Sequence, residues 1–430
     1  MDGQNKLIAQ IEDSRARTLK LIEQLDEKQL MGPPLPIVNP LRWEIGHTAY
    51  FYEYWVLRHH FGEAAGRPDV DRLYDSISIA HDDRWDLPLP SMPDTLAYMK
   101  SVLSRVRARL AEGKADPRRD YLTRYAVYHE DMHTEAFTYT RQTLAYPQPD
   151  IAPEPEPDWQ IAELAGDTEI PGGLFQLGAS IDDGFVFDNE KWAHTVEVAP
   201  FGIARTATTN AEYADFVDDG GYQRREFWDD AGWQWRTAVK LDHPIYWRRT
   251  AEEWQLRRFD SWQPLPADAT VIHVSWHEAQ AYCRWAGRRL PSELEWEVAA
   301  AGEPTVDGQR LAARKRRYPW GDREPTPALA NLDGGALGTI DARALPDGDS
   351  AFGCRQMIGN VWEWTDTLFG PYPGFKPDMY QDYSQPLFGS TRVLRGGAWA
   401  TRGRLIRNTW RNYYGPDRND VFAGFRTCAL

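Results

Sequence analysis

Apolar residues recur at helical spacing through the N-terminal part of the chain. Within residues 4–28, the positions that share one helical face are Leu7, Ile8, Ile11, Leu19, Ile22 and Leu25. Similar patterns, with a Pro-Asp start signal before the third, predict helices over about 41–60, 94–110 and 119–144. Four such helices with one long crossover predict a helical bundle, whose core is a usual place for a metal site.

The texture of the chain changes after the last of these helices. Residues 147–158 interleave proline with polar and acidic residues, a composition typical of a semi-rigid linker. Beyond them the sequence is rich in Gly and Trp, with short apolar runs and many turn signals, and its clearest helices are predicted over 276–287 and 292–301. The predicted division is a helical bundle over 1–146, a linker over 147–160 and an irregular α+β domain over 161–430.

Composition narrows the classes of function. The formal net charge of −15 is unlike the basic surface of a nucleic-acid-binding protein, and the basic run at 314–317 is interpreted as a solvated loop. No run of about 18 apolar residues indicates a membrane span, and the polar N-terminus is unlike a signal peptide. Cys283, Cys354 and Cys428 form neither a disulfide framework nor a CxxC motif. We therefore expect a cytoplasmic protein with no nucleic-acid or membrane partner.

A histidine pair is the strongest chemical signal. His129 and His133 are four residues apart in the last predicted helix of the bundle, so their rings lie one turn apart on the same face. Two such imidazoles can bind one divalent metal, and His47, in the second predicted helix, is the candidate third ligand in an antiparallel bundle. His273 and His277 form a weaker second pair.

The first pair also completes an H-E-x-x-H string, the signature of zinc peptidases, in which Glu130 would be the general base. That interpretation needs a third metal ligand downstream. Residues 134–139 contain neither the glycine nor the histidine of the extended peptidase motif, and the predicted linker follows soon after. A peptidase is therefore a less favoured alternative.

Longer strings carry a resemblance to a known family. Residues 43–51 and the spacing His129-x-x-x-His133-x-Glu135 resemble the DinB-like bundle of EgtB-type sulfoxide synthases. The second half resembles the formylglycine-generating-enzyme (sulfatase-modifying-factor) fold, a C-type-lectin-like α+β fold, in strings at 170–178, 274–276, 281–287, 289–297, 318–321, 359–364, 393–399 and 424–426. The resemblance covers nearly the whole chain. It implies a multidomain protein in which a DinB-like four-helix bundle precedes an irregular α+β domain.

This resemblance implies a mononuclear non-haem Fe(II) enzyme. Such enzymes use O2 to join a sulfur or selenium donor to C2 of the imidazole of hercynine, which yields a sulfoxide or selenoxide. Carried over by motif, His47, His129 and His133 are the implied iron ligands, and the remaining coordination positions stay open for substrate and O2. Glu135 is implied to support the site without binding the metal.

The implied hercynine pocket surrounds a string that corresponds here to residues 410–414. Asn412 is implied to hold polar groups of the substrate. Trp410, Tyr413 and Tyr414 are implied to offer aromatic faces to the trimethylammonium group, an interaction worth roughly 0.5–2 kcal/mol per ring. Packing in a strand core is the alternative for this string.

Two further roles are expected in the second half. The tyrosine that donates a proton in the O2 step is expected to be Tyr372 or Tyr380. Residues 359–364 are a possible structural Ca²⁺ site, in which Asn360 and backbone oxygens would be the ligands.

Three positions depart from the best-known ergothioneine synthases. The loop at 73–86 has Arg84 where a pair of arginines binds the carboxylate of γ-glutamylcysteine. Tyr414 replaces an acidic partner for an ammonium group, and Met132 replaces a glutamine before the last histidine. The missing charges favour a seleno- or thiosugar donor, as in the selenoneine synthase (SenA-type) branch. The alternatives are an ergothioneine synthase that uses cysteine or γ-glutamylcysteine, a zinc-dependent thiol transferase or peptidase, and a non-catalytic binding module.

Overall fold

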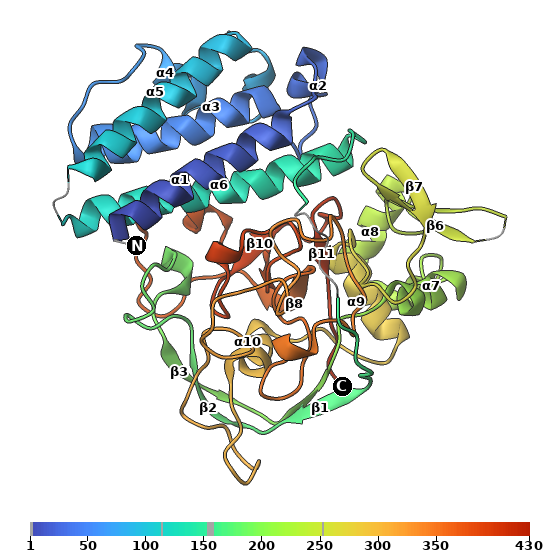
Figure 1. Cartoon of the computed structure of the whole chain (residues 1–430). Coiled ribbons are helices and arrows are strands. Elements are labelled where there is room, and N and C mark those ends of the chain that lie inside the picture. Colours follow the sequence, from blue (N-terminus) through green and yellow to red (C-terminus); the bar gives the residue numbers. More distant parts are fainter. Residues whose placement is uncertain (1–2, 113–114, 153–158, 252) are drawn as a thin grey trace. The chain divides into compact units, whose positions relative to one another are not determined.

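The computed structural model describes residues 3–112, 115–152, 159–251 and 253–430. The chain forms two compact units, Met1–Ile151 and Ala152–Leu430. Residues 153–158, in the middle of the predicted linker, lie outside the described residues. The first unit is helical and the second mixes helices with short strands (Figure 1), which confirms the predicted fold class.

The first unit contains α1 Gly3–Ile22, α2 Glu27–Met31, α3 Leu41–Tyr52, the π-helix η1 Glu53–His60, α4 Val70–Tyr74, the 3-10 helix η2 Asp82–Trp85, α5 Met92–Ala111 and α6 Pro117–Thr143. Within this unit α1 packs along α6, and α3 packs against both α5 and α6 (Figure 1). With η1 continuing α3, these long elements form the predicted bundle.

The helix predicted over residues 4–28 is interrupted. α1 ends at Ile22, and Gln24 takes a left-handed backbone conformation (φ 67°) that does not continue a helix. Asp26 then starts α2 with a capping box: its carboxylate accepts the Gln29 N–H at 2.7 Å, and the Gln29 side chain accepts the Asp26 N–H at 3.0 Å. Leu25 therefore lies between the two helices.

A buried ion pair fixes the orientation of α6 against α1. Arg15 Nε donates to Glu130 Oε1 at 2.7 Å, and the Thr18 hydroxyl donates to the same oxygen at 2.9 Å. All three side chains are buried. Two side chains of α1 thus hold Glu130, and with it α6, against that helix.

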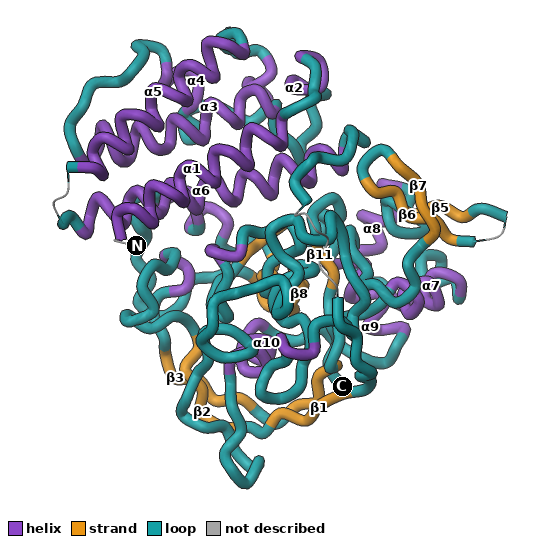
Figure 2. Tube along the Cα trace, viewed as in Figure 1, coloured by secondary structure: helices purple, strands orange, loops and turns teal. Residues whose placement is uncertain are grey.

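The second unit is built from short elements. Its helices are α7 Asn210–Asp218, α8 Asp230–Val239, α9 Trp276–Trp285 and α10 Glu293–Ala301, with 3-10 turns η3 Asp188–Glu190, η4 Arg225–Phe227, η5 Pro346–Gly348, η6 Gln381–Tyr383, η7 Gln385–Leu387 and η8 Gly403–Leu405. Its strands are β1 Asp167–Ile170, β2 Gly173–Leu177, β3 His194–Val198, β4 Phe201–Ala204, β5 Trp247–Arg249, β6 Trp254–Arg258, β7 Ser261–Pro264, β8 Trp362–Leu368, β9 Arg392–Arg395, β10 Asn412–Tyr414 and β11 Ala423–Gly424. Loops make up most of this unit (Figure 2).

The strands form several small sheets rather than one large one. The largest has the order β10-β9-β8-β11, in which β9 is antiparallel to both neighbours and β11 is parallel to β8. β1 pairs with β4, β2 pairs with β3, and β5, β6 and β7 form a three-stranded meander. Few of the loop carbonyls can therefore find a partner in a sheet ladder.

Buried arginine–glutamate pairs supply many of the hydrogen bonds that sheet ladders would otherwise give to these loops. The pairs are Arg395–Glu297, Arg407–Glu190, Arg411–Glu293 and Arg426–Glu363. Arg426 is an example. Its Nε donates to Glu363 at 2.7 Å, while its Nη1 donates to the carbonyls of Ala204 and Arg205 at 3.1 and 3.2 Å. One guanidinium thus joins a strand to a distant loop through several hydrogen bonds.

We expect Arg426→Met to lower the free energy of unfolding by about 3–5 kcal/mol, because it leaves the buried Glu363 carboxylate without its cation. Chemical unfolding of the full chain, followed by tryptophan fluorescence, measures the loss. The matched control is Arg224→Met, which removes an exposed pair with Glu226 and should cost less than about 1 kcal/mol. Equal losses in the two variants would contradict a structural role for the buried pair.

Candidate metal centre

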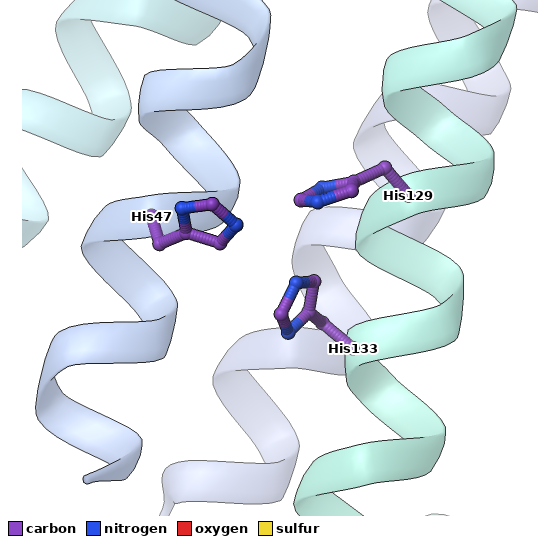
Figure 3. Close-up of side chains that lie close together, drawn as sticks. All are labelled: His47, His129 and His133. Carbon is purple, nitrogen blue, oxygen red and sulfur yellow. The ribbon is translucent and has the colours of Figure 1, made fainter. Parts of the chain in front are cut away.

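Three histidines from two helices of the first unit face one another. His47 lies in the middle of α3, and His129 and His133 lie one turn apart on α6. One ligand nitrogen of each ring lies within 4.8 Å of the others, and the ring centroids are 4.6 to 5.1 Å apart. The close-up in Figure 3 shows the three rings turned toward a shared space between the helices. The structure therefore brings together the three residues predicted as ligands.

The environment keeps His47 and His129 neutral. Burial away from water lowers the pKa of His47 well below its ordinary value, and the nearby His133 lowers it further. Burial likewise lowers the pKa of His129, with His133 and His47 adding to the effect. A neutral imidazole keeps a lone pair on one nitrogen, which is the form that binds a metal.

Hydrogen bonds assign the lone pair in two of the rings. His47 Nδ1 lies 2.8 Å from the backbone carbonyl oxygen of Tyr74. Because a carbonyl can only accept, His47 Nδ1 carries the hydrogen and Nε2 keeps the lone pair. His133 Nδ1 lies 3.0 Å from Glu44 Oε1, which favours the same tautomer in His133.

Aromatic side chains fix the planes of the rings. Trp43 stacks on His47 with centroids 4.7 Å apart and an interplanar angle of 10°, and its indole N–H donates to the Leu73 carbonyl at 2.7 Å. Phe51 stacks on His129 at 3.8 Å and 11°. All these contacts come from α3 and the segment that follows it, so the ligand rings are held by rigid elements.

The structure places Glu130 away from the three histidines. Its oxygens accept hydrogen bonds from Arg15 and Thr18 of α1. A peptidase of the H-E-x-x-H type needs this carboxylate beside the metal-bound water. The geometry is therefore unfavourable for a peptidase.

Arg84 and Met132 lie in the same unit as the histidines. The Arg84 guanidinium sits 4.1 Å from the Trp43 ring centre and donates to Asn39 Oδ1 at 2.6 Å. Met132 is half-buried beside His133, and Glu135 is buried one half-turn further along α6. Arg84 is thus stacked on the tryptophan that itself stacks on His47.

The predicted pocket string lies on and beside β10. Trp410 is buried and packs edge to face against Trp362 at 4.9 Å. Asn412, Tyr413 and Tyr414 form the strand, where side chains alternate between faces. Tyr413 stacks on Phe369, so Asn412 and Tyr414 share the other face. Within the strand, Tyr413 therefore lies on one face and Asn412 and Tyr414 on the other.

The two candidate proton donors differ in exposure. Tyr372 belongs to the buried core of the second unit, where its ring lies 4.1 Å from the Arg411 guanidinium and its hydroxyl lies 3.4 Å from Glu293 Oε2. Burial raises the pKa of Tyr372 well above its ordinary value. Tyr380 is half-buried and directly precedes η6.

The structure lends no support to the expected Ca²⁺ site. Asn360 Oδ1 already accepts hydrogen bonds from Asn331 Nδ2 at 3.0 Å and from the Ile340 N–H at 2.9 Å. The amide nitrogen of Asn360 donates to Thr270 at 3.0 Å. Both lone pairs of that oxygen are thus used within the protein, and the residue ties loops together.

Sequence reasoning missed the residues that support the ligands. Glu44 and Trp43 precede His47 by three and four residues, so helical spacing places them beside it. Tyr74 gave no sequence signal, because it acts through a backbone carbonyl. Gly46 belongs with it: a Cβ at this position would meet the Tyr74 ring at 2.2 Å.

No helix among the described residues is long and apolar enough to cross a membrane.

A cavity of about 590 Å³ in the second unit is lined by residues that include Gln176, Lys315, Arg317 and Thr409. None of the predicted substrate-binding residues is among those that line this cavity.

Both halves of the chain match known protein families. Residues 152–429 match the family described as "Sulfatase-modifying factor enzyme 1-like domain", and residues 10–143 match "DinB superfamily". A "Hercynine oxygenase" from Mycolicibacterium thermoresistibile is 39% identical over 98% of this chain and 94% of its own. A "Hercynine oxygenase" from Mycobacterium tuberculosis is 38% identical over 99% of both chains. A "Formylglycine-generating enzyme" from Streptomyces coelicolor is 34% identical over 66% of this chain and 96% of its own.

We expect Gly46→Ala to disturb the centre from one residue away, because the new Cβ displaces Tyr74 and with it the carbonyl that holds His47. The free energy of unfolding should fall by about 1–3 kcal/mol. The affinity for Co²⁺, followed by its absorption spectrum, should fall roughly 10–100-fold.

The double variant Gly46→Ala with Tyr74→Leu removes the ring that clashes but keeps the carbonyl. It should recover Co²⁺ affinity relative to the single variant. An unchanged affinity in Gly46→Ala would show that the close approach of Tyr74 does not position His47.

Proposed function

Because the chain belongs to the family of hercynine oxygenases, which are EgtB-type sulfoxide synthases, we propose that it forms a carbon–sulfur or carbon–selenium bond to hercynine at a ferrous centre. The family makes it an oxidative enzyme that acts on small molecules. In the proposed reaction the imidazole C2–H and the donor S–H or Se–H are replaced by a C–S or C–Se bond. Their two hydrogens leave with one oxygen atom of O2 as water, and the other oxygen atom ends on sulfur or selenium.

The convergence of His47, His129 and His133 is the observation that carries this proposal. The donor set fits Fe(II). Three imidazole nitrogens occupy only part of its coordination sphere, and because they are neutral they leave its positive charge unbalanced. A ferrous ion held in this way supplies open positions for O2 and a sulfur or selenium donor. The protein supplies the orientation of the rings, through Tyr74, Glu44 and the aromatic stacks.

Zinc is the competing metal, because three histidines also suit a catalytic Zn²⁺ site. A zinc peptidase is disfavoured by the position of Glu130, which is bound to Arg15. A zinc-dependent thiol transferase or a non-catalytic binding module would use the same histidines without O2. The family favours the oxidative reaction over both.

For the donor we propose a seleno- or thiosugar rather than an amino acid. Arg84, the one arginine of the expected carboxylate-binding loop, is stacked on Trp43 and bonded to Asn39. Tyr414 supplies a phenol where an acidic group would bind an ammonium. Both features fit a donor without amino-acid charges.

For the second unit we propose that Asn412 and Tyr414 contact substrate, because they share one face of β10. Tyr413 and Trp410, which pack against Phe369 and Trp362, would support that strand from behind and beside it. Tyr380 is preferred to Tyr372 as the proton donor, because Tyr372 is enclosed in the core of its unit.

We expect protein purified without oxygen to retain stoichiometric iron. His47→Ala, His129→Ala and His133→Ala should each lose it, since removing a ligand weakens binding more than the roughly 10–100-fold typical of an outer partner. Metal analysis by mass spectrometry measures this. His59→Ala, an exposed histidine of η1, is the control that should bind iron like the parent protein. Full iron content in His47→Ala would remove His47 from the ligand set.

We expect the Fe(II) enzyme, supplied with hercynine and O2, to turn over a seleno- or thiosugar faster than cysteine or γ-glutamylcysteine. Product formation for each donor, followed by mass spectrometry at equal concentrations, gives the comparison as a ratio of kcat/KM. Leaving out hercynine is the control for uncoupled oxidation of the donor. Comparable or better turnover with γ-glutamylcysteine would end the sugar proposal and favour ergothioneine synthesis.

A further inference from the structure

Glu44 is a buried carboxylate that contacts a proposed ligand without being one. It lies three residues before His47 on the same face of α3, and it is 2% exposed. Its Oε1 lies 3.0 Å from His133 Nδ1 and accepts a longer hydrogen bond, 3.3 Å, from Asn39 Nδ2. Helix α3 thus supplies one ligand directly and holds another, on α6, through Glu44.

Among the residues that the structure describes, no arginine or lysine forms an ion pair with Glu44. Across the described parts of the chain, its hydrogen-bond partners are Asn39 and His133, and its second oxygen is buried without one. Asn39 links Glu44 to Arg84, which donates to Asn39 Oδ1. An isolated buried carboxylate destabilises a folded protein strongly, so this arrangement requires a compensating positive charge nearby.

Glu53, in the same unit, is a buried carboxylate whose charge is balanced in the usual way, by an arginine. Its carboxylate is fully buried, and it accepts hydrogen bonds from Arg105 at 2.9 Å, the Tyr98 hydroxyl at 2.9 Å and the Gly66 N–H at 2.6 Å. The comparison marks Glu44 as different, because its main partner is not an arginine but a histidine ring that faces the metal centre.

We propose that Glu44 is the built-in counter-charge of the divalent metal, and that it makes His133 the strongest electron donor among the three ligands. This inference rests on the ferrous centre proposed above. A carboxylate that accepts the Nδ1–H of a ligand imidazole places negative charge on the ring and fixes its tautomer. His47 receives the weaker counterpart of this contact, from the neutral carbonyl of Tyr74. Glu44 is therefore a positioning residue that acts through His133.

The proposal predicts opposite effects of Glu44→Gln in the two states of the protein. Glutamine keeps an oxygen that can accept the His133 Nδ1–H but removes the charge. Without metal, the variant should be more stable than the parent, because an uncompensated buried charge is gone. With Fe(II) bound, the order should reverse, because the metal has lost its counter-charge.

The test is thermal unfolding of the full chain, metal-free and loaded with Fe(II) under nitrogen. Both states are measured in the same buffer and at the same pH. The expected result is that Glu44→Gln has a higher Tm than the parent without metal and a lower Tm than the parent with Fe(II) bound. Glu53→Gln is the matched control, which should lower Tm in both states. A Glu44→Gln variant that fails to fold, or that melts lower than the parent in both states, would assign Glu44 a merely structural role and overturn the proposal.

Two further readouts use the metal itself. Competition with a chelator should show Fe(II) affinity about 10–100-fold lower in Glu44→Gln. The Fe(III)/Fe(II) midpoint potential should rise, because a negative charge near the metal stabilises the ferric form. Unchanged values of affinity or of potential would overturn the role of the charge.

These results are separable from the proposed function. If the parent protein binds no Fe(II), the proposed function fails and the inference fails with it. If the parent binds Fe(II) and oxidises hercynine while Glu44→Gln matches it in affinity and potential, only the inference fails.

Discussion

The first unit depends on bringing three histidine rings to one place, with two of them buried in their neutral form. Taking His47 and His129 out of water is tolerable only because desolvation lowers their pKa and keeps them uncharged. Three nitrogen lone pairs then face a shared space, and a cation bound between them makes this arrangement favourable. Metal binding and the packing of α3 against α6 are thus linked through the same rings.

The bundle meets this constraint by holding each ring through a different contact. A carbonyl holds His47, a carboxylate holds His133, and a phenyl ring lies flat against His129. The carboxylate and the phenyl ring both belong to α3, and α6 is also fixed by α1, where Arg15 binds Glu130. Rotation of α6 would break its contacts with both helices, which is why side chains on helices can hold a geometry that loops could not.

Sequence reasoning located the centre but not what supports it. The spacing of His129 and His133 is a local property, and a helical period converts it directly into geometry. The interruption between α1 and α2 was also readable, because Asp26 and Gln29 have the spacing of a capping box. Tyr74 was not predictable, since every residue has a carbonyl. The role of Glu44 depends on which ring of α6 lies opposite, and only the tertiary structure decides that.

The second unit is stabilised in a different way, because its short strands leave much of the backbone outside any sheet ladder. Guanidinium groups such as that of Arg426 bind those carbonyls and are themselves held by buried carboxylates. On β10 itself, Tyr413 adds to this support, because its ring stacks on Phe369 and its hydroxyl donates to the Tyr383 carbonyl. Tyr414 pairs with Arg392 of β9 through the backbone register, so exchanging its side chain leaves the strand in place. Under the proposed function, a change of donor therefore needs only new side chains on such a strand, while the helices that hold the three histidines stay unchanged.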